Sequence, residues 1–176
     1  MRGKRVALCA SRKLDEMTTL IEKQGGTAVI RPAQGTVFLK GSELSEEMRA
    51  IIMMRPDWIV FTTGIGVEAL WKTAEREGIA VEWKRVIENA DIAARGYKTV
   101  AALKNIGVIP TAVSEDGTTK GLISALNAYD FAGKSVVAQL YGDTAPVLKQ
   151  FFLTRGASYT ELFPYRHVAP DHEMLE

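Results

Sequence analysis

The sequence predicts an α/β fold with a parallel sheet that carries helices on both faces. Short apolar runs typical of buried strands alternate with longer segments whose apolar residues recur at helical spacing. Glycine or proline ends most of these segments, and the connections between them are short. Strands that alternate with helices in this way pair in parallel, and helices cover both faces of the resulting sheet.

The chain begins with a strand, a helix and a second strand. The strand Arg5–Cys9 is a short apolar run, and the helix Leu14–Lys23 has its apolar residues on one face. Two glycines then supply the left-handed stop that is typical of a helix end. The strand Thr27–Arg31 ends at Pro32. Cys9 is the only cysteine, and we expect it to be a small buried side chain in the first strand.

The next elements follow the same alternation. Thr36–Leu39 is expected to be an extended linker. A helix is expected from Ser45 to Met54, because glutamates in its first turn favour the positive end of the helix dipole. The strand Asp57–Phe61 and the helix Val67–Glu77 follow. A turn of small and hydroxyl residues connects these two elements.

The middle of the chain adds two further strand and helix pairs. A strand is expected at Asp91–Ala94, and a helix follows from about Thr99 to Ile106. Val108–Pro110 is expected to be a short strand. A polar loop over Ser114–Gly121 then leads into the helix Leu122–Ala128.

The last part of the sequence repeats the first. A strand at Ser135–Ala138, a helix at Pro146–Leu153 and a strand ending at Pro164 follow the pattern of the chain's beginning. An offset of 130 residues relates two glycine pairs, Gly3 with Gly133 and Gly26 with Gly156. A duplicated protein would continue with a second copy of the pattern over 57–110, which is absent from the given chain. Chance similarity between two strand–helix units is the alternative.

Composition excludes several classes of function. Lys and Arg number 22 against 21 Asp and Glu, and this balance argues against nucleic acid as a partner. No apolar run reaches the ~20 residues of a membrane span, and the N-terminal run is too short for a signal peptide. We therefore expect a cytoplasmic protein. His167 and His172 are the only histidines, and both lie near the end of the given chain. This argues against a metal site built on histidine and cysteine and against a Ser-His-Asp triad. We expect no metal and no cofactor.

Small, hydroxyl and basic residues recur where predicted strands give way to helices. The carboxyl ends of parallel strands share one edge of a sheet, where ligands bind, and helix N-termini there attract anions. Each residue on its own is also an ordinary helix cap. Together they predict a small-molecule ligand with several carboxylates or phosphates. The candidate binding residues are Arg12, Thr62, Thr63, Gly64, Gly96, Lys98, Thr99, Thr118, Thr119 and Gly142.

Two further features offer chemistry. The segment Gly64–Ala69 matches the dinucleotide fingerprint, but Val81–Arg85 shows no clean strand where an acidic strand end is needed. A tight strand-to-helix turn is the better explanation of the glycines. Tyr165 follows Pro164 directly, and its phenol could donate a proton to a leaving hydroxyl, with packing at an element end as the alternative.

Four segments in this order resemble the uroporphyrinogen-III synthase family. They are Gly3-Lys-Arg-Val with Arg12, Asp57-Trp-Ile-Val-Phe-Thr-Thr-Gly with Val67, Ile92-Ala-Ala-Arg-Gly-Tyr-Lys-Thr99 with Leu103 and Gly107, and Leu162-Phe-Pro-Tyr165. The resemblance covers almost the whole chain. The sequence departs from the family at Thr62-Thr63, where a serine is usual in second place, and at Arg95, where an apolar residue precedes the glycine. Arg95 could mark a divergent or non-catalytic paralogue.

The resemblance implies two α/β domains joined by a two-stranded ladder. Residues 1–35 would be the N-terminal part of domain 1, residues 36–164 a complete domain 2, and residues 165–176 a linker strand returning to domain 1. The rest of domain 1 would lie beyond Glu176, so the given chain alone would be inactive. The family resemblance does not fix the oligomeric state, and we expect a monomer.

The implied activity is that of a cofactor-free lyase of heme biosynthesis. The linear tetrapyrrole hydroxymethylbilane would lose water and close into a ring, with inversion of ring D. Tyr165 would donate a proton to the leaving hydroxyl, and the ten candidate residues would hold the substrate's carboxylates. A tetrapyrrole-binding regulatory module without catalysis and a nucleotide-binding domain are the alternatives.

Overall fold

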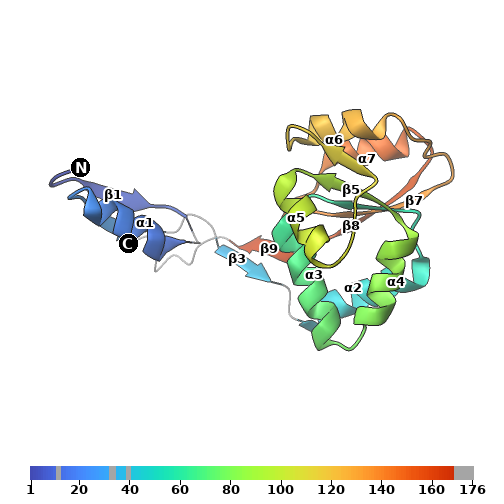
Figure 1. Ribbon diagram of the computed structural model, residues 1–176, viewed down its shortest axis with the longest axis horizontal. Helices are drawn as coiled ribbons and strands as arrows, with labels where there is room; N and C mark the ends of the chain where they lie inside the picture. The colour runs from blue at the N-terminus through green and yellow to red at the C-terminus, as the bar shows by residue number, and fades with distance from the viewer. Residues whose placement is uncertain (11–12, 32–34, 39–40, 169–176) are drawn as a thin grey trace. The chain divides into compact units, whose positions relative to one another are not determined.

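The computed structural model describes residues 1–10, 13–31, 35–38 and 41–168. The chain divides into two compact units (Figure 1). Unit 1 comprises Met1–Val37 with Arg166–Glu176, and unit 2 comprises Phe38–Tyr165. The strands β3 (Gly35–Phe38) and β9 (Tyr165–Val168) form a two-stranded sheet. This sheet contains most of the extended linker expected at Thr36–Leu39 and the beginning of the linker strand expected at residues 165–176.

Unit 1 contains the predicted strand, helix and strand. β1 (Arg5–Leu8) pairs in parallel with β2 (Thr27–Ile30), and α1 (Leu14–Lys23) connects them. The helix has the predicted bounds. The prediction of a buried Cys9 is wrong, because the strand ends at Leu8 and the cysteine that follows is exposed.

Unit 2 is built on a five-stranded parallel sheet in the order β6-β5-β4-β7-β8. The predicted parallel sheet with helices on both faces is confirmed. Its strands are β4 (Trp58–Phe61), β5 (Asp91–Arg95), β6 (Ala112–Ser114), β7 (Ser135–Gln139) and β8 (Ser158–Leu162). Its helices are α2 (Gly41–Met54), α3 (Gly64–Arg76), α4 (Ala80–Asn89), α5 (Tyr97–Asn105), α6 (Thr119–Leu126) and α7 (Pro146–Leu153).

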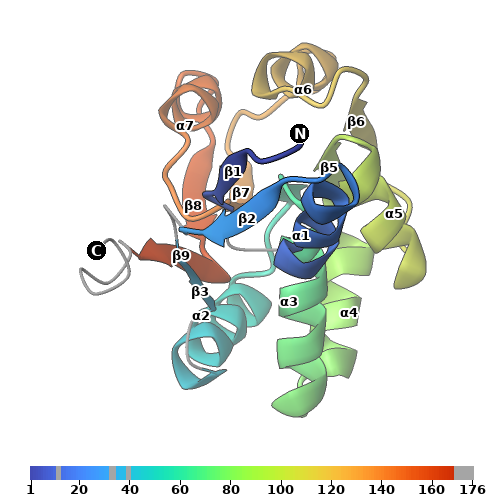
Figure 2. The same ribbon diagram turned by 90° about the vertical axis from the view of Figure 1, so that its left-hand side faces the viewer.

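Alternate residues of the strands supply two hydrophobic cores. Ile59 and Phe61 of β4 pack with α2, α3, α4 and α5. Trp58 and Val60 face the other way and pack with α6 and α7. Figure 2 shows α6 and α7 above the sheet and α2, α3 and α4 below it. Because both faces are covered, β4 is buried along its whole length, as expected for a central strand of a parallel sheet.

Several predicted boundaries are wrong. Helix α2 begins at Gly41, so Ser45 is an internal helical residue instead of its first. Val81–Arg85 lies in α4, a helix that the sequence analysis did not predict. The strand expected at Val108–Pro110 lies instead at Ala112–Ser114. Pairing with β5 begins at Thr111, whose N–H donates to the Ile92 carbonyl. Proline has no N–H to pair in this way.

Two helices begin earlier than predicted because threonines cap them. Thr63 accepts a hydrogen bond from the Gly66 N–H, so α3 begins at Gly64 instead of Val67. Thr118 accepts one from the Gly121 N–H, and α6 begins at Thr119. A capping hydroxyl satisfies an N–H that has no partner inside the helix.

The predicted repeat has a counterpart in backbone geometry. The Gly3 N–H donates to the Gly25 carbonyl at 3.0 Å, and the Gly133 N–H donates to the Gly156 carbonyl at 3.0 Å. Gly25 has φ 75° and Gly156 has φ 78°, so these two residues are equivalent helix stops. The predicted equivalence of Gly26 with Gly156 is therefore wrong by one residue.

Asp57 ties the amino ends of β4 and β7 together, at the edge of the sheet opposite the strands' carboxyl ends. Its Oδ2 accepts hydrogen bonds from the Ser135 N–H at 2.8 Å and from the Ser135 hydroxyl at 2.9 Å. The Lys134 ammonium lies 3.3 Å from Oδ1. The two bonds from Ser135, followed by those with Lys134, lower the pKa of the Asp57 carboxyl below its usual 3.8.

We expect Asp57→Asn to lower the melting temperature by a few degrees near neutral pH. A carboxyl whose pKa is lower in the folded state contributes stability above its unfolded pKa, and loses it as the pH falls through the folded value. The difference between wild type and variant should therefore shrink below pH 3.8. Thermal melts across this range test the prediction, with the exposed Glu115→Gln as control. A difference that does not change with pH would contradict it.

Candidate functional site

The order of the strands places a crevice at the carboxyl ends of β4 and β7. From β4 the chain proceeds through β5 to β6 at one edge of the sheet, then returns to β7 on the other side of β4 and ends at β8. In open α/β sheets, ligands bind where the strand order reverses in this way. The sheet alone therefore predicts a binding site between the ends of β4 and β7.

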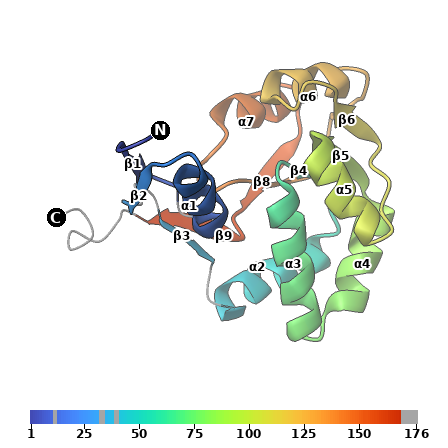
Figure 3. The same ribbon diagram turned by 60° about the vertical axis from the view of Figure 1, so that its left-hand side comes forward.

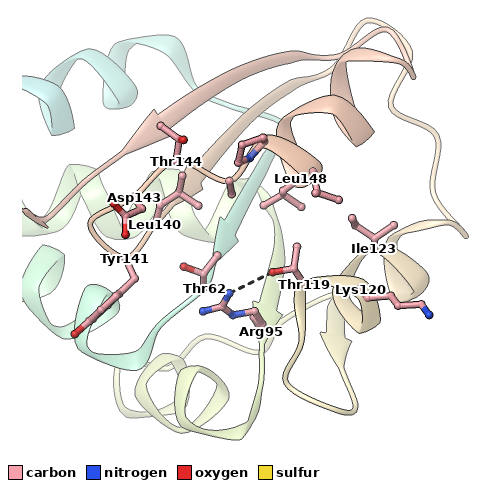
Figure 4. A pocket seen from close by; sticks show the side chains of 13 residues that line it. Thr62, Arg95, Thr119, Lys120, Ile123, Leu140, Tyr141, Asp143, Thr144 and Leu148 are labelled. Carbon is pink, nitrogen blue, oxygen red and sulfur yellow. Dashed lines mark hydrogen bonds between the residues drawn. The ribbon is translucent and has the colours of Figure 1, made fainter. Parts of the chain in front are cut away.

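A pocket of about 670 Å³ lies at this position in unit 2. Its polar side includes Thr62 after β4, Arg95 at the end of β5 and Thr119 at the start of α6. Leu148 of α7 and Ile123 of α6 line the apolar side. Figure 4 shows these side chains around the cavity, with the hydrogen bond from Arg95 Nη1 to Thr119 Oγ1 at 3.3 Å.

A buried hydrogen-bond network lies beside the pocket. The Gln139 side chain is fully buried, and its Oε1 accepts a hydrogen bond from the Thr63 N–H at 3.2 Å. Its Nε2 donates to the Leu140 carbonyl at 2.8 Å. The Thr62 hydroxyl donates to the Gln139 carbonyl at 2.7 Å. The amide thus fixes the turn after β4 against the end of β7.

Tyr165 joins the same network. Its hydroxyl lies 2.7 Å from Thr63 Oγ1, and its ring packs edge-on against Tyr141 with centroids 4.9 Å apart. The residue is fully buried. It is the last residue of unit 2 and the first of β9. Thr63 thus connects the tyrosine hydroxyl to the buried Gln139 amide.

The other candidate binding residues have varied positions. Thr62 and Thr119 line the pocket, but Thr99 is buried, and its hydroxyl donates to the Arg95 carbonyl at 3.0 Å. Lys98 is exposed, with its ammonium 5.9 Å from the centre of the Tyr97 ring.

The remaining candidates lie in turns next to helices and strands. Thr118 caps α6. Gly142 follows β7 with φ 70°, and Gly96 precedes α5 with φ 86°. Arg12 lies outside the described residues.

The glycines of the dinucleotide-like motif have structural roles. A Cβ on Gly66 would lie 2.2 Å from the Gln139 amide, and one on Gly64 would lie 2.7 Å from the Lys98 carbonyl oxygen. Figure 3 shows α3 and α5 side by side, as this close approach requires. Protein contacts therefore account for both glycines. Val81–Arg85 is helical, so it offers no strand end for a ribose either.

Asp116 shapes the turn before α6. Its carboxylate accepts hydrogen bonds from the Thr118 N–H at 2.9 Å, from the Thr118 hydroxyl at 2.8 Å and from the Ser114 hydroxyl at 2.8 Å. These bonds, the backbone bond from Thr118 above all, lower the pKa of the Asp116 carboxyl. The group is held as a carboxylate, which suits a structural acceptor and not a proton donor near neutral pH.

Sequence reasoning did not name Gln139 or Arg95 as binding residues. Gln139 is a polar residue at the end of an otherwise apolar strand, and this was the available signal. Arg95 was noted only as a departure from the family pattern.

Among residues 1–10, 13–31, 35–38 and 41–168, no cluster of three metal-ligating side chains occurs. In the same ranges, no helix is both long and apolar enough for a bilayer.

Comparison with known proteins identifies the family. The family model described as uroporphyrinogen-III synthase HemD matches residues 15–176. The chain belongs to the uroporphyrinogen-III synthase family. It is 48% identical over 174 residues to the uncharacterised protein YjjA of Bacillus subtilis (strain 168), covering 99% of this chain and 64% of YjjA.

Solved structures of the family have the same fold. A mutant uroporphyrinogen III synthase from the extremely thermophilic bacterium Thermus thermophilus matches with a TM-score of 0.81 at 33% identity, over 97% of this chain and 65% of that one. The wild-type enzyme in another crystal form matches with a TM-score of 0.73, over 97% and 64%. The chain thus spans less than two thirds of the length of these relatives.

Proposed function

We propose that the full-length protein is a uroporphyrinogen-III synthase, which closes hydroxymethylbilane into a ring with inversion of ring D and loss of water. The observation that carries the proposal is the pocket at the reversal of strand order in a unit with this family's fold. Its polar side presents Arg95, Thr62 and Thr119, and its other side is apolar. A substrate made of flat pyrrole rings with carboxylate side chains matches both sides.

The chemistry asks little of the protein's side chains. A pyrrole nitrogen of the substrate can itself expel the hydroxyl, so the protein has to hold a folded conformation and assist departure of water. Helices α3, α5 and α6 begin at the carboxyl edge of the sheet. Their N-termini carry partial positive charge and favour carboxylates at this edge. This arrangement suits a reaction without histidine, metal or cofactor.

We expect Tyr165→Phe to slow turnover by less than the ~10²-fold that a direct general acid typically supplies. The buried hydroxyl contacts Thr63 and supports the turn after β4, while the substrate provides most of the driving force for loss of water. Initial rates of hydroxymethylbilane consumption measure the effect. Tyr129→Phe, which also removes a tyrosine hydroxyl bonded within unit 2, is the control. A wild-type rate for Tyr165→Phe would remove the tyrosine from the mechanism.

Genetic complementation tests the proposed function. The full-length gene should restore growth without added heme to a bacterium that lacks its own uroporphyrinogen-III synthase. Failure of an expressed, folded protein to do so would contradict the proposal.

A non-catalytic, tetrapyrrole-binding protein is the second candidate, because Arg95 departs from the family pattern inside the pocket itself. Such a protein would bind a tetrapyrrole without turnover. A DNA-binding segment encoded after Glu176 would favour this candidate.

A further inference from the structure

The pocket in unit 2 contains a guanidinium group at the end of β5. Arg95 is half-buried and lines the cavity together with Thr62 and Thr119. Its Nη1 donates to Thr119 Oγ1 at 3.3 Å, which orients the planar group (Figure 4). A guanidinium has five N–H donors, so one bond to a hydroxyl leaves most of its donor capacity for a ligand.

No carboxylate of the described residues neutralises this group. The ion pairs of residues 1–10, 13–31, 35–38 and 41–168 join other residues, and none includes Arg95. Among the described residues that line the pocket, Asp143 is the only acidic one, and it is exposed. Lys120 is also exposed, and its ammonium points away from the guanidinium in Figure 4. The guanidinium therefore keeps its positive charge and most of its N–H donors available to an anionic ligand in the pocket.

The apolar wall of the pocket indicates which kind of ligand carries the anionic group. Ile123 of α6 and Leu148 of α7 line the pocket, and Leu140 after β7 adds a third apolar side chain. Inorganic phosphate or a sugar phosphate would leave this wall uncovered. A flat apolar ring with a short carboxylate arm contacts both sides, because guanidinium and carboxylate form two parallel hydrogen bonds in one plane.

We propose that Arg95 binds a carboxylate of the ligand in the unit 2 pocket, with the attached ring packed against Ile123 and Leu148. That the ring is a pyrrole of a tetrapyrrole rests on the function proposed above, whereas recognition of a carboxylate by Arg95 does not. The side chain adds a charged contact where the family resemblance implied an apolar residue. Arg95 thereby determines ligand affinity and specificity in this protein.

Binding of uroporphyrin I, an octacarboxylate that carries its own fluorescence, tests the proposal on the full-length protein. We expect Arg95→Gln to raise the dissociation constant about tenfold, which is about 1.4 kcal/mol. Arg95→Lys keeps the charge but not the planar fork, and its affinity should lie between those of wild type and Arg95→Gln. Arg85→Gln removes the same charge from an exposed position on α4, on the other side of the sheet, and should bind like wild type.

The outcomes separate this proposal from the proposed function. Unchanged dissociation constants for both Arg95 variants would overturn it, even if the protein makes uroporphyrinogen III. If Arg95→Gln binds more weakly than wild type while Arg85→Gln binds like wild type, the proposal is supported, even if the protein has no synthase activity. Equal weakening by Arg85→Gln would assign the effect to net charge and also overturn it. If Arg95→Gln fails to fold, the comparison of Arg95→Lys with wild type decides.

Discussion

Replacing Gln139 with methionine is expected to destabilise the protein by about 3 kcal/mol, since a buried polar group left without its partner costs about 1–3 kcal/mol. Methionine has a similar length, so the substitution removes hydrogen bonds without opening a large cavity. The Thr63 N–H loses its bond to Oε1, and the Leu140 carbonyl loses its bond from Nε2. The turn after β4 would then lose its attachment to β7.

Denaturant or thermal unfolding measures this loss. Gln150→Met provides a matched control, because Gln150 is an exposed residue of α7. We expect the control to unfold within about 0.5 kcal/mol of wild type, as is usual for surface substitutions. Equal stabilities of the Gln139 and Gln150 variants would show that the buried amide contributes nothing to the turn.

Gly66→Ala is expected to destabilise the protein by about 2 kcal/mol, although alanine normally stabilises a helix by about 1 kcal/mol relative to glycine. The added Cβ would lie 2.2 Å from the side chain of Gln139, which is fully buried and cannot move into solvent. Either α3 or the amide must shift, and both belong to the edge of the proposed site. Loss of tetrapyrrole binding should accompany the loss of stability.

A double variant isolates the cause. In a Gln139→Ala background the clash is removed, so Gly66→Ala should cost much less there than in wild type. Glu68→Ala introduces the same residue at an exposed position of α3 and should leave stability nearly unchanged. Equal costs of Gly66→Ala in both backgrounds would contradict the assigned contact.

The parts of the fold that could be predicted are those with strong local signals. Helices α1 and α7 have the predicted bounds, because apolar spacing and a glycine stop define each of them. Helix α4 was missed although Trp83, Val86 and Ile87 form its buried face. Its preceding turn has no strong cap, and it follows α3 without an intervening strand, which broke the expected alternation.

The candidate site was only partly predictable for a similar reason. Thr62 and Thr119 were recognisable as turn residues at strand ends, and both line the pocket. The roles of Gln139 and Arg95 depend on which strands are neighbours, and only the observed strand order places Gln139 against Thr63. Thr99 was also predicted as a binding residue because it carries a hydroxyl near a helix start. Its hydroxyl instead donates to the Arg95 carbonyl four residues earlier.

Analysis of the product isomer tests the central claim most directly. Hydroxymethylbilane is incubated with the full-length protein, and the uroporphyrinogens are oxidised and separated by chromatography. Hydroxymethylbilane without enzyme closes to the type I isomer, so it serves as the blank. The proposed function predicts that the type III isomer, with ring D inverted, is the main product, and that its fraction rises with protein concentration. Only the type I isomer at every protein concentration would contradict it.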